Sequence, residues 1–283
     1  MNNKVCFLDL FSGIGGFALA AYWAGLRFNE HYFSEIEPYA IEIYKKRFPD
    51  AISLGDITKI DFIELKKTGD WLVTGGFPCQ PYSVAGKQRG KDDKRDLWPE
   101  CNRILRELQP KIALFENVSG ILNSDNGQFF NRVLSDISAC GYDCEWQVIS
   151  AAEVGAPHKR ERVWICAYSA IESKRSGISN QERIETTQRD RFTNLCKTFS
   201  HADSERCQEQ PYRIATRARD IDSPSCRNGN GDYWAVEPDV GRVAHGVPSR
   251  VDRLKGLGNA IVPQCAEVIF DLPAFDEWRI KNE

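Results

Sequence analysis

The first 24 residues limit the choice of fold more than any other segment of the chain. Residues 5–11 are a run of apolar, β-compatible residues, which predicts a buried strand. A glycine-rich turn follows at residues 12–16, and residues 17–24 have the composition of a helix. Strand, glycine turn and helix in this order are typical of the first unit of an open α/β sheet that binds a nucleotide. The turn lacks a Walker A pattern, so a tight turn that binds nothing also fits this segment taken alone.

Apolar segments with the same alternation continue along the chain. They predict strands at residues 31–35, 51–58, 71–74, 111–115, 144–149 and 163–167, and helices at 38–48, 97–108, 128–140 and 263–270. We therefore expect an α/β fold with a Rossmann-like, mostly parallel sheet and helices on both faces. We divide the chain into a domain of residues 1–167, a small, loop-rich polar region of residues 168–245, and a C-terminal segment of residues 246–283 that returns to the first domain.

Composition and charge exclude several classes of protein. The net charge is −3, so contact with a polyanion must come from a local basic face. The sequence has neither a run of 18 apolar residues nor a signal-peptide pattern, and we expect a cytoplasmic protein without membrane contact. The ten cysteines include no Cys-x-x-Cys pair and no accompanying His cluster, so we expect neither a metal site nor a disulfide framework.

Two acidic residues follow predicted strands on the N-terminal side of the sheet. Glu35 ends the second strand, about 20 residues after the glycine turn, where a carboxylate can bind a ribose diol. Asp56 follows the third strand and could accept a hydrogen bond from an adenine amino group. A helix N-cap or turn role explains Asp56 equally well.

A cysteine and a glutamate occupy comparable positions after two later strands. Gly75 and Gly76 interrupt the strand at residues 71–74, and Pro78 stiffens the loop that presents Cys79. An isolated cysteine in such a turn is more often a buried structural residue than a nucleophile. Glu116 ends the strand at residues 111–115, and the carboxyl ends of parallel strands share one edge of a sheet. The pattern therefore predicts a thiol and a carboxyl at the same edge.

Two segments are rich in cations. Residues 84–96 contain glycine, lysine, arginine and aspartate, and they either close over a nucleic acid or form an ordinary solvated loop. Residues 158–162 alternate cations before a strand, which suits either the anchoring of a phosphate or base carbonyl, or a salt-bridged turn.

Five short motifs in the chain carry a family resemblance. In order they are Asp9-Leu10-Phe11-Ser12-Gly13-Ile14-Gly15-Gly16, Gly76-Phe77-Pro78-Cys79-Gln80, Glu116-Asn117-Val118, Lys159-Arg160-Glu161-Arg162 and Gly258-Asn259-Ala260-Ile261-Val262-Pro263. Each motif alone is weak, but the series in this order closely resembles that of bacterial and phage DNA (cytosine-5) methyltransferases. The resemblance covers residues 4–167 and 234–270 and omits the polar middle of the chain.

The resemblance implies S-adenosylmethionine as the cofactor, S-adenosylhomocysteine as the product, and double-stranded DNA as the substrate. It implies a monomer without a bound metal, related by function and not by contact to a restriction endonuclease. The cofactor-binding residues that it implies are Phe11, Ser12, Gly13, Ile14, Gly15, Gly16, Glu35, Ile36, Asp56, Ile57, Phe77, Pro78, Leu97, Asn259 and Ala260. The DNA-binding residues are Gln80, Ser83, Lys87, Arg89 and Arg242.

The chemistry implied by the resemblance has four catalytic residues. Cys79 attacks C6 of a cytosine that has flipped out of the duplex, and Glu116 binds or protonates N3. Arg162 holds O2, and Arg160 helps to place the substrate backbone. C5 then accepts the methyl group, a base removes its proton, and Cys79 leaves.

The chain departs from the family pattern in two places. His158 to Arg162 stands where Gln-Arg-Arg-Glu-Arg is common, and the motif around Arg242 is loose. The region of residues 168–245 is short and poor in apolar residues, so it is either a small DNA-reading module or a partly disordered insertion. An RNA cytosine-5 methyltransferase, a catalytically silent DNA-binding relative and a nicotinamide dehydrogenase are the alternative functions. The last of these leaves the Cys79 loop unexplained.

Overall fold

A computed structural model describes residues 4–67, 69–78, 96–169 and 250–279 of the chain. The described strands are β1 (Val5–Leu10), β2 (Glu30–Ser34), β3 (Ile52–Ser53), β4 (Asp70–Gly76), β5 (Ile112–Val118), β6 (Tyr142–Ile149) and β7 (Arg162–Ser169). They form one sheet in the order β3-β2-β1-β4-β5-β7-β6. β1 to β5 pair in parallel, and β7 runs antiparallel to both β5 and β6. The expected α/β fold with a mostly parallel sheet is confirmed.

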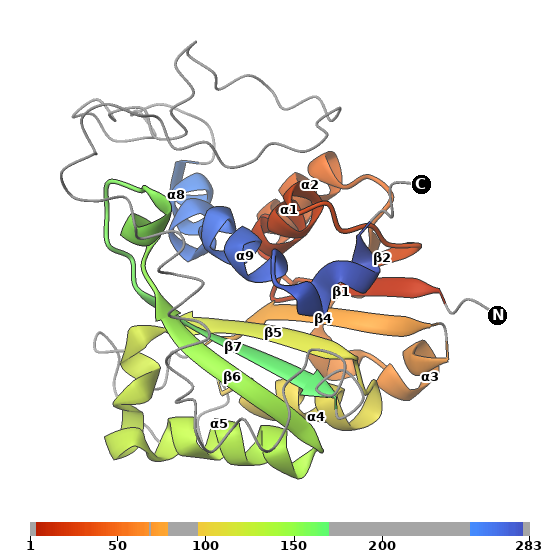
Figure 1. Cartoon of the computed structure of the whole chain (residues 1–283). Coiled ribbons are helices and arrows are strands. Elements are labelled where there is room, and N and C mark those ends of the chain that lie inside the picture. Colours follow the sequence, from red (N-terminus) through yellow and green to blue (C-terminus); the bar gives the residue numbers. More distant parts are fainter. Residues whose placement is uncertain (1–3, 68, 79–95, 170–249, 280–283) are drawn as a thin grey trace.

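Helices cover both faces of this sheet (Figure 1). One face carries α3 (Phe62–Lys66), α4 (Trp98–Glu107) and α5 (Gln128–Ala139), and the other carries α1 (Gly16–Trp23), α2 (Pro38–Arg47) and α9 (Pro263–Phe270). The two apolar cores reflect this arrangement, because β1 sends Cys6, Leu8 and Leu10 into the first core and Phe7 into the second. Such alternation follows from the two-residue period of a strand.

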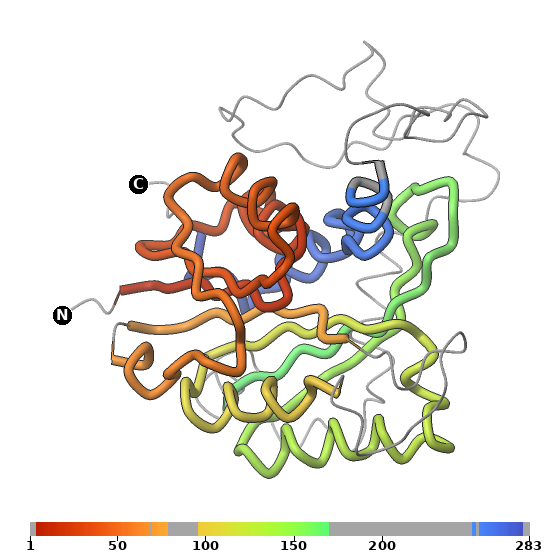
Figure 2. Tube along the Cα trace, turned by 180° about the vertical axis from the view of Figure 1, so that it is seen from behind, coloured from red at the N-terminus to blue at the C-terminus, as the bar shows by residue number. Residues whose placement is uncertain are grey.

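The C-terminal segment lies against the N-terminal helices. α9 packs beside α1, as Figures 1 and 2 show from opposite sides. A short 3₁₀ segment, Pro273–Trp278, follows α9 and buries Phe275 and Trp278 in the same core. The return of the C-terminal segment was expected from the sequence, whereas the 3₁₀ segment was not.

Residues 256–259 differ from the expectation. We expect a Gly-Asn turn at residues 258–259 from the sequence, but these two residues are the end of a helix, α8 (Arg250–Asn259). Glycine inside a helix costs about 1 kcal/mol relative to alanine, so local preference opposes this conformation. A Cβ added at Gly256 would lie at ordinary van der Waals distance from Ile14 and Tyr39, at 3.5 and 3.8 Å, so this part of α8 lies beside the glycine turn and the start of α2.

The strand order creates a crevice at one edge of the sheet. The chain leaves β1 toward β2 on one side, whereas β4 lies on the other side of β1. In open α/β sheets, ligands bind beyond the carboxyl ends of two neighbouring parallel strands whose following connections run to opposite sides. The glycine turn and the start of the Cys79 loop both leave the sheet at this point.

No helix in the described part of the chain is long and apolar enough to cross a membrane. The same part contains no group of three or more His, Cys, Asp or Glu side chains arranged to hold a metal ion.

Candidate active site

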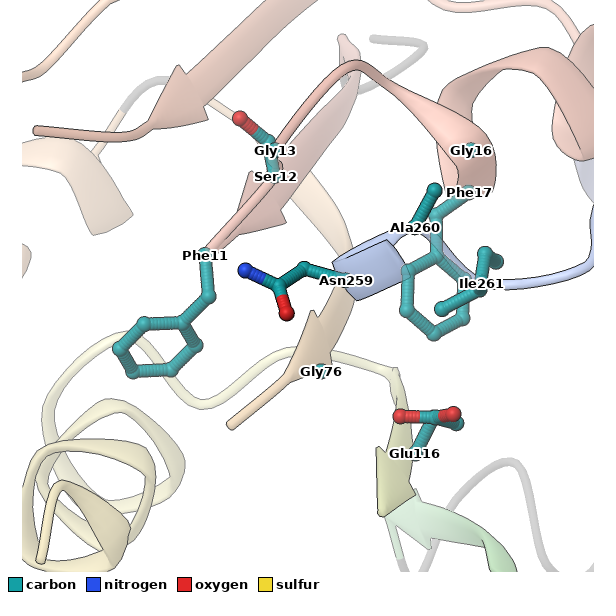
Figure 3. A pocket seen from close by; sticks show the side chains of 10 residues that line it. All are labelled: Phe11, Ser12, Gly13, Gly16, Phe17, Gly76, Glu116, Asn259, Ala260 and Ile261. Atoms are coloured by element: carbon teal, nitrogen blue, oxygen red, sulfur yellow. The ribbon is translucent and has the colours of Figure 1, made fainter. Parts of the chain in front are cut away.

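A pocket opens at the carboxyl ends of β1, β4 and β5 (Figure 3). It has a volume of about 350 Å³, part of which is open solvent. Its lining residues come from both ends of the chain and are Phe11, Ser12, Gly13, Gly16, Phe17, Gly76, Glu116, Asn259, Ala260 and Ile261. Seven of these were expected from the sequence, and Phe17, Gly76 and Ile261 were not.

The turn after β1 has an unusual backbone. Phe11, Gly13 and Gly15 have φ angles of 50°, 52° and 87°, in the left-handed region. This conformation costs a residue with a side chain on the order of 1 kcal/mol, and such strain gathers at ligand sites. Within the described residues, the buried hydroxyl of Ser12 has no hydrogen-bond partner. A buried polar atom without a partner on a pocket wall is suited to a polar ligand.

Glu35 connects the second strand to this turn. Its carboxylate accepts hydrogen bonds from the backbone N–H groups of Gly13, Ile36 and Glu37 at 2.8, 2.8 and 2.9 Å. It does not line the pocket, but it fixes the position of Gly13, which does. Glu37 extends away from Glu35 and forms an ion pair with Lys255 on α8 at 2.5 Å.

Glu116 is the acidic group inside the pocket. It lies within β5 opposite Gly76 of β4, because the pairing with β7 extends the strand to Val118. The residue is only 8% exposed, and burial raises the pKa of its carboxyl to about 7, although Arg162 and Arg160 lower it. The group can therefore change its protonation state near neutral pH.

Arg162 pairs with Glu116 across the sheet. Trp164 of β7 is the residue opposite Glu116, and Arg162 lies two residues before Trp164, on the same face. Its Nε contacts Oε1 of Glu116 at 3.0 Å. The expected proximity of this arginine to the acid is observed.

Arg160 is oriented differently from Arg162. Its Nη2 donates hydrogen bonds to the carbonyl oxygens of Gly258 and Ala260, at 2.9 and 2.7 Å. The family resemblance implies that both arginines bind the substrate, but of the two only Arg162 forms an ion pair with Glu116. Arg160 binds the C-terminal end of α8.

Several of the other predicted cofactor residues lie around the pocket and do not line it. Asp56 accepts a hydrogen bond from the Thr58 backbone N–H at 3.0 Å and caps a 3₁₀ turn, Ile57–Lys59. Ile57 is buried, whereas Ile36 is 73% exposed. Phe77 is buried between Trp98 and Phe115. Four more predicted cofactor residues do not line the pocket either: Ile14, Gly15, Pro78 and Leu97.

Asn117 belongs to the Glu116-Asn117-Val118 motif, but the sequence predicted no function for it. Its side chain is 2% exposed, and its Nδ2 donates to the carbonyl oxygen of Phe77 at 2.9 Å. The same side chain accepts from the Val118 backbone N–H at 2.9 Å. It therefore fastens β5 to the residue that stands two positions before Cys79. A second polar residue directly after Glu116, at the end of an apolar strand, was the only sign of this in the sequence.

Six predicted residues lie outside the described part of the chain. They are Cys79, Gln80, Ser83, Lys87, Arg89 and Arg242. Most of the polar region of residues 168–245 lies outside it as well. The described residues therefore contain the acid, both arginines and the pocket, but not the thiol.

This fold and pocket resemble a known class of enzyme. A solved structure from an E. coli prophage, described as a DNA modification methyltransferase, superimposes with a TM-score of 0.52 at 28% identity, covering 63% of this chain and 50% of that one. The family model of the C-5 cytosine-specific DNA methylases matches residues 5–230. The chain therefore belongs to the C-5 cytosine-specific DNA methylase family.

Curated relatives agree with this family. The type II methyltransferase M1.ScrFI of Lactococcus lactis subsp. cremoris is 37% identical over 62% of this chain and 43% of its own length. M.HhaI of Haemophilus parahaemolyticus is 36% identical over 57% of this chain and 48% of its own length. The orphan methyltransferase M.Rho11sI of Bacillus phage rho11s is 36% identical over 58% of this chain and 33% of its own length. The matched part of the chain spans less than half the length of each of these relatives.

Proposed function

We propose that this chain transfers the methyl group of S-adenosylmethionine to C5 of cytosine in a specific sequence of double-stranded DNA. The observation that carries the proposal is the pairing of Gly76 with Glu116 beside the pocket. Three residues after Gly76 the sequence has Cys79, and consecutive Cα atoms are about 3.8 Å apart. A thiol that follows so closely on the strand beside Glu116 suits attack on the same small ring.

The pocket is suited to S-adenosylmethionine, the methyl donor that the family uses. The Asn259 amide offers a polar group on the wall of the pocket (Figure 3), and the buried Ser12 hydroxyl has no hydrogen-bond partner within the described residues. Glu35 is held beside Gly13, where one carboxylate can shape the turn and also accept from a ribose. Phe11, Phe17 and Ile261 supply apolar walls. When bound, the cofactor supplies an electrophilic methyl group.

Glu116 and Arg162 prepare the cytosine ring. The Cys79 thiolate forms a bond to C6, and the electron pair of the C5–C6 double bond is redistributed toward C5 and N3. A protonated Glu116 donates its proton to N3 and neutralises the ring as the thiolate adds. Its raised pKa of about 7 leaves a large fraction protonated at neutral pH. Arg162, next to Glu116, lies where its cationic group can bind the adjacent O2.

The remaining steps restore the ring. C5 takes the methyl group, which leaves S-adenosylhomocysteine behind, and a base removes the C5 proton. The electrons of that C–H bond restore the C5–C6 double bond and expel the Cys79 thiolate from C6, and N3 returns its proton to Glu116. A base in a duplex is inaccessible to these groups, so the target cytosine flips out of the stack. Gln80, Ser83, Lys87, Arg89 and Arg242 are our candidates for DNA contacts. A role in restriction–modification or phage DNA protection fits the type II and orphan methyltransferases that this chain resembles. Our proposal includes a monomeric enzyme and a restriction endonuclease related to it by function and not by contact.

Methyl transfer from labelled S-adenosylmethionine tests this proposal directly. The full chain should label duplex DNA, and Cys79→Ala should abolish the label while S-adenosylhomocysteine binding persists. Labelling of tRNA in place of duplex DNA would refute the substrate, and unchanged labelling by the alanine variant would refute the covalent mechanism. A duplex that contains 5-fluorocytosine should trap the wild-type chain, because its C5 carries no removable proton. Bisulfite sequencing of DNA from cells that express the chain would then report the methylated sequence.

A further inference from the structure

Arg160 lies in the connection that precedes β7, two residues before Arg162. Its backbone is left-handed, with a φ of 39°, which is unusual for a residue that has a side chain. The half-buried guanidinium reaches the C-terminal end of α8 and donates to Gly258 and Ala260. The nearby cations are oriented differently, since Lys159 is exposed and Arg162, two residues further on, contacts Glu116.

The two accepting carbonyl groups lie at a helix end. The last carbonyl groups of a helix have no partner within the helix, and a cation there also interacts favourably with the helix dipole. Hydrogen bonds from a charged donor are stronger than those between neutral groups. α8 also forms the Lys255–Glu37 ion pair, but both of those side chains are more than 40% exposed, and exposed pairs contribute little. Arg160 therefore provides the stronger of these two polar attachments of α8.

Asn259 lies between the two carbonyl groups that Arg160 binds. Asn259, Ala260 and Ile261 together form the wall of the pocket that comes from the C-terminal part of the chain (Figure 3). This wall fits closely against the glycine turn, because a Cβ added to Gly16 would lie 2.6 Å from Cγ1 of Ile261. A small displacement of residues 259–261 would therefore change the shape of the pocket.

We propose that Arg160 is a positioning residue for the cofactor, which clamps the end of α8 so that Asn259 to Ile261 close the pocket. It acts through Asn259 and not by contact with the DNA backbone. This inference rests on the proposed function, because it takes the pocket as the S-adenosylmethionine site. It also links the two halves of the site, since the connection that carries Arg160 leads directly to Arg162.

Equilibrium binding of S-adenosylhomocysteine to the full chain, measured by calorimetry without DNA, tests the clamp. Arg160→Gln should weaken binding by about tenfold or more, because two hydrogen bonds from a charged donor are lost. Lys159→Gln is the matched control, since it removes the same charge one residue away, and its affinity should stay within about twofold of wild type. Arg160→Lys keeps the charge, but its side chain is shorter and lacks the planar guanidinium, so it should be intermediate.

A double variant separates positioning from general loss of structure. In an Asn259→Ala background, Arg160→Gln should weaken binding far less than it does in the wild type, because the group through which it acts is gone. Equal effects in both backgrounds would refute the clamp. Wild-type affinity in Arg160→Gln, with a raised KM for DNA alone, would refute it in favour of a backbone contact. A wild-type chain that binds S-adenosylhomocysteine but methylates no DNA would refute the proposed function and leave the clamp standing.

Discussion

The buried carboxyl of Glu116 makes stability depend on pH in a way that one substitution can test. Burial raises its pKa from 4.5 to about 7. An acid whose pKa is higher in the folded than in the unfolded chain stabilises the fold fully below the unfolded pKa, and this contribution is lost as the pH rises through the folded pKa. The shift corresponds to about 3 kcal/mol, most of which falls between pH 5 and pH 8.

Glu116→Gln should remove this dependence. Urea unfolding at pH 5 and pH 8 should show the glutamine variant gaining about 2 to 3 kcal/mol in free energy of unfolding relative to wild type as the pH rises. Glu42→Gln, at an exposed ion pair with Lys46, is the control and should follow the wild-type pH profile. Arg162→Gln should enlarge the pH dependence, because Arg162 lowers the pKa of Glu116. A relative gain within about 0.5 kcal/mol for Glu116→Gln would show that the carboxyl keeps an ordinary pKa, and the case for Glu116 as a proton donor would fail.

Three further substitutions test other parts of the site. Asp9 is fully buried, its carboxylate accepts a hydrogen bond from the Thr74 hydroxyl at 2.9 Å, and burial raises its pKa to about 7. Asp9→Asn should therefore also reduce the loss of stability with rising pH. A pH dependence of urea unfolding as steep as that of wild type would contradict this. Gly16→Ala should weaken S-adenosylhomocysteine binding, because its Cβ would lie 2.6 Å from Cγ1 of Ile261. Adding Ile261→Ala to the same chain should restore part of the affinity. If it does not, the predicted clash is excluded. Asn117→Asp loses the donor to the Phe77 carbonyl oxygen and should slow trapping of a 5-fluorocytosine duplex while cofactor affinity stays unchanged. Trapping at the wild-type rate would show that this hydrogen bond does not position the Cys79 loop.

The two arginines show that backbone conformation and tertiary contacts, and not residue type alone, decide which partner a side chain binds. Arg160 and Arg162 have the same chemistry and stand two residues apart. Arg162 belongs to β7, so strand geometry directs it toward Glu116. Arg160 precedes the strand with a left-handed backbone and is directed toward α8. Their different partners come from this change of backbone conformation, which the alternation of charges does not reveal.

Much of the fold could be predicted from the sequence, because the apolar runs have the periods of strands and helices. The strand that precedes Glu35 and the strand that contains Glu116 were expected within a few residues of their observed positions. The glycine turn was expected to form the ligand site, and it does line the pocket. These features depend on residues close together in the chain, where backbone geometry and the burial of apolar side chains leave few alternatives.

Contacts between distant segments decided what the sequence left open. Residues 256–259 are helical although their two glycines disfavour a helix locally, and this end of α8 lies beside Ile14 and Tyr39. The insertion of β7 between β5 and β6 determines that Arg162 meets Glu116. The pKa of Glu116 depends on burial by several elements, which no local pattern encodes. The role of Arg160 depends on two carbonyl groups about a hundred residues further along the chain. Side-chain chemistry is set residue by residue, but the partner that each side chain meets is set only when the chain has folded.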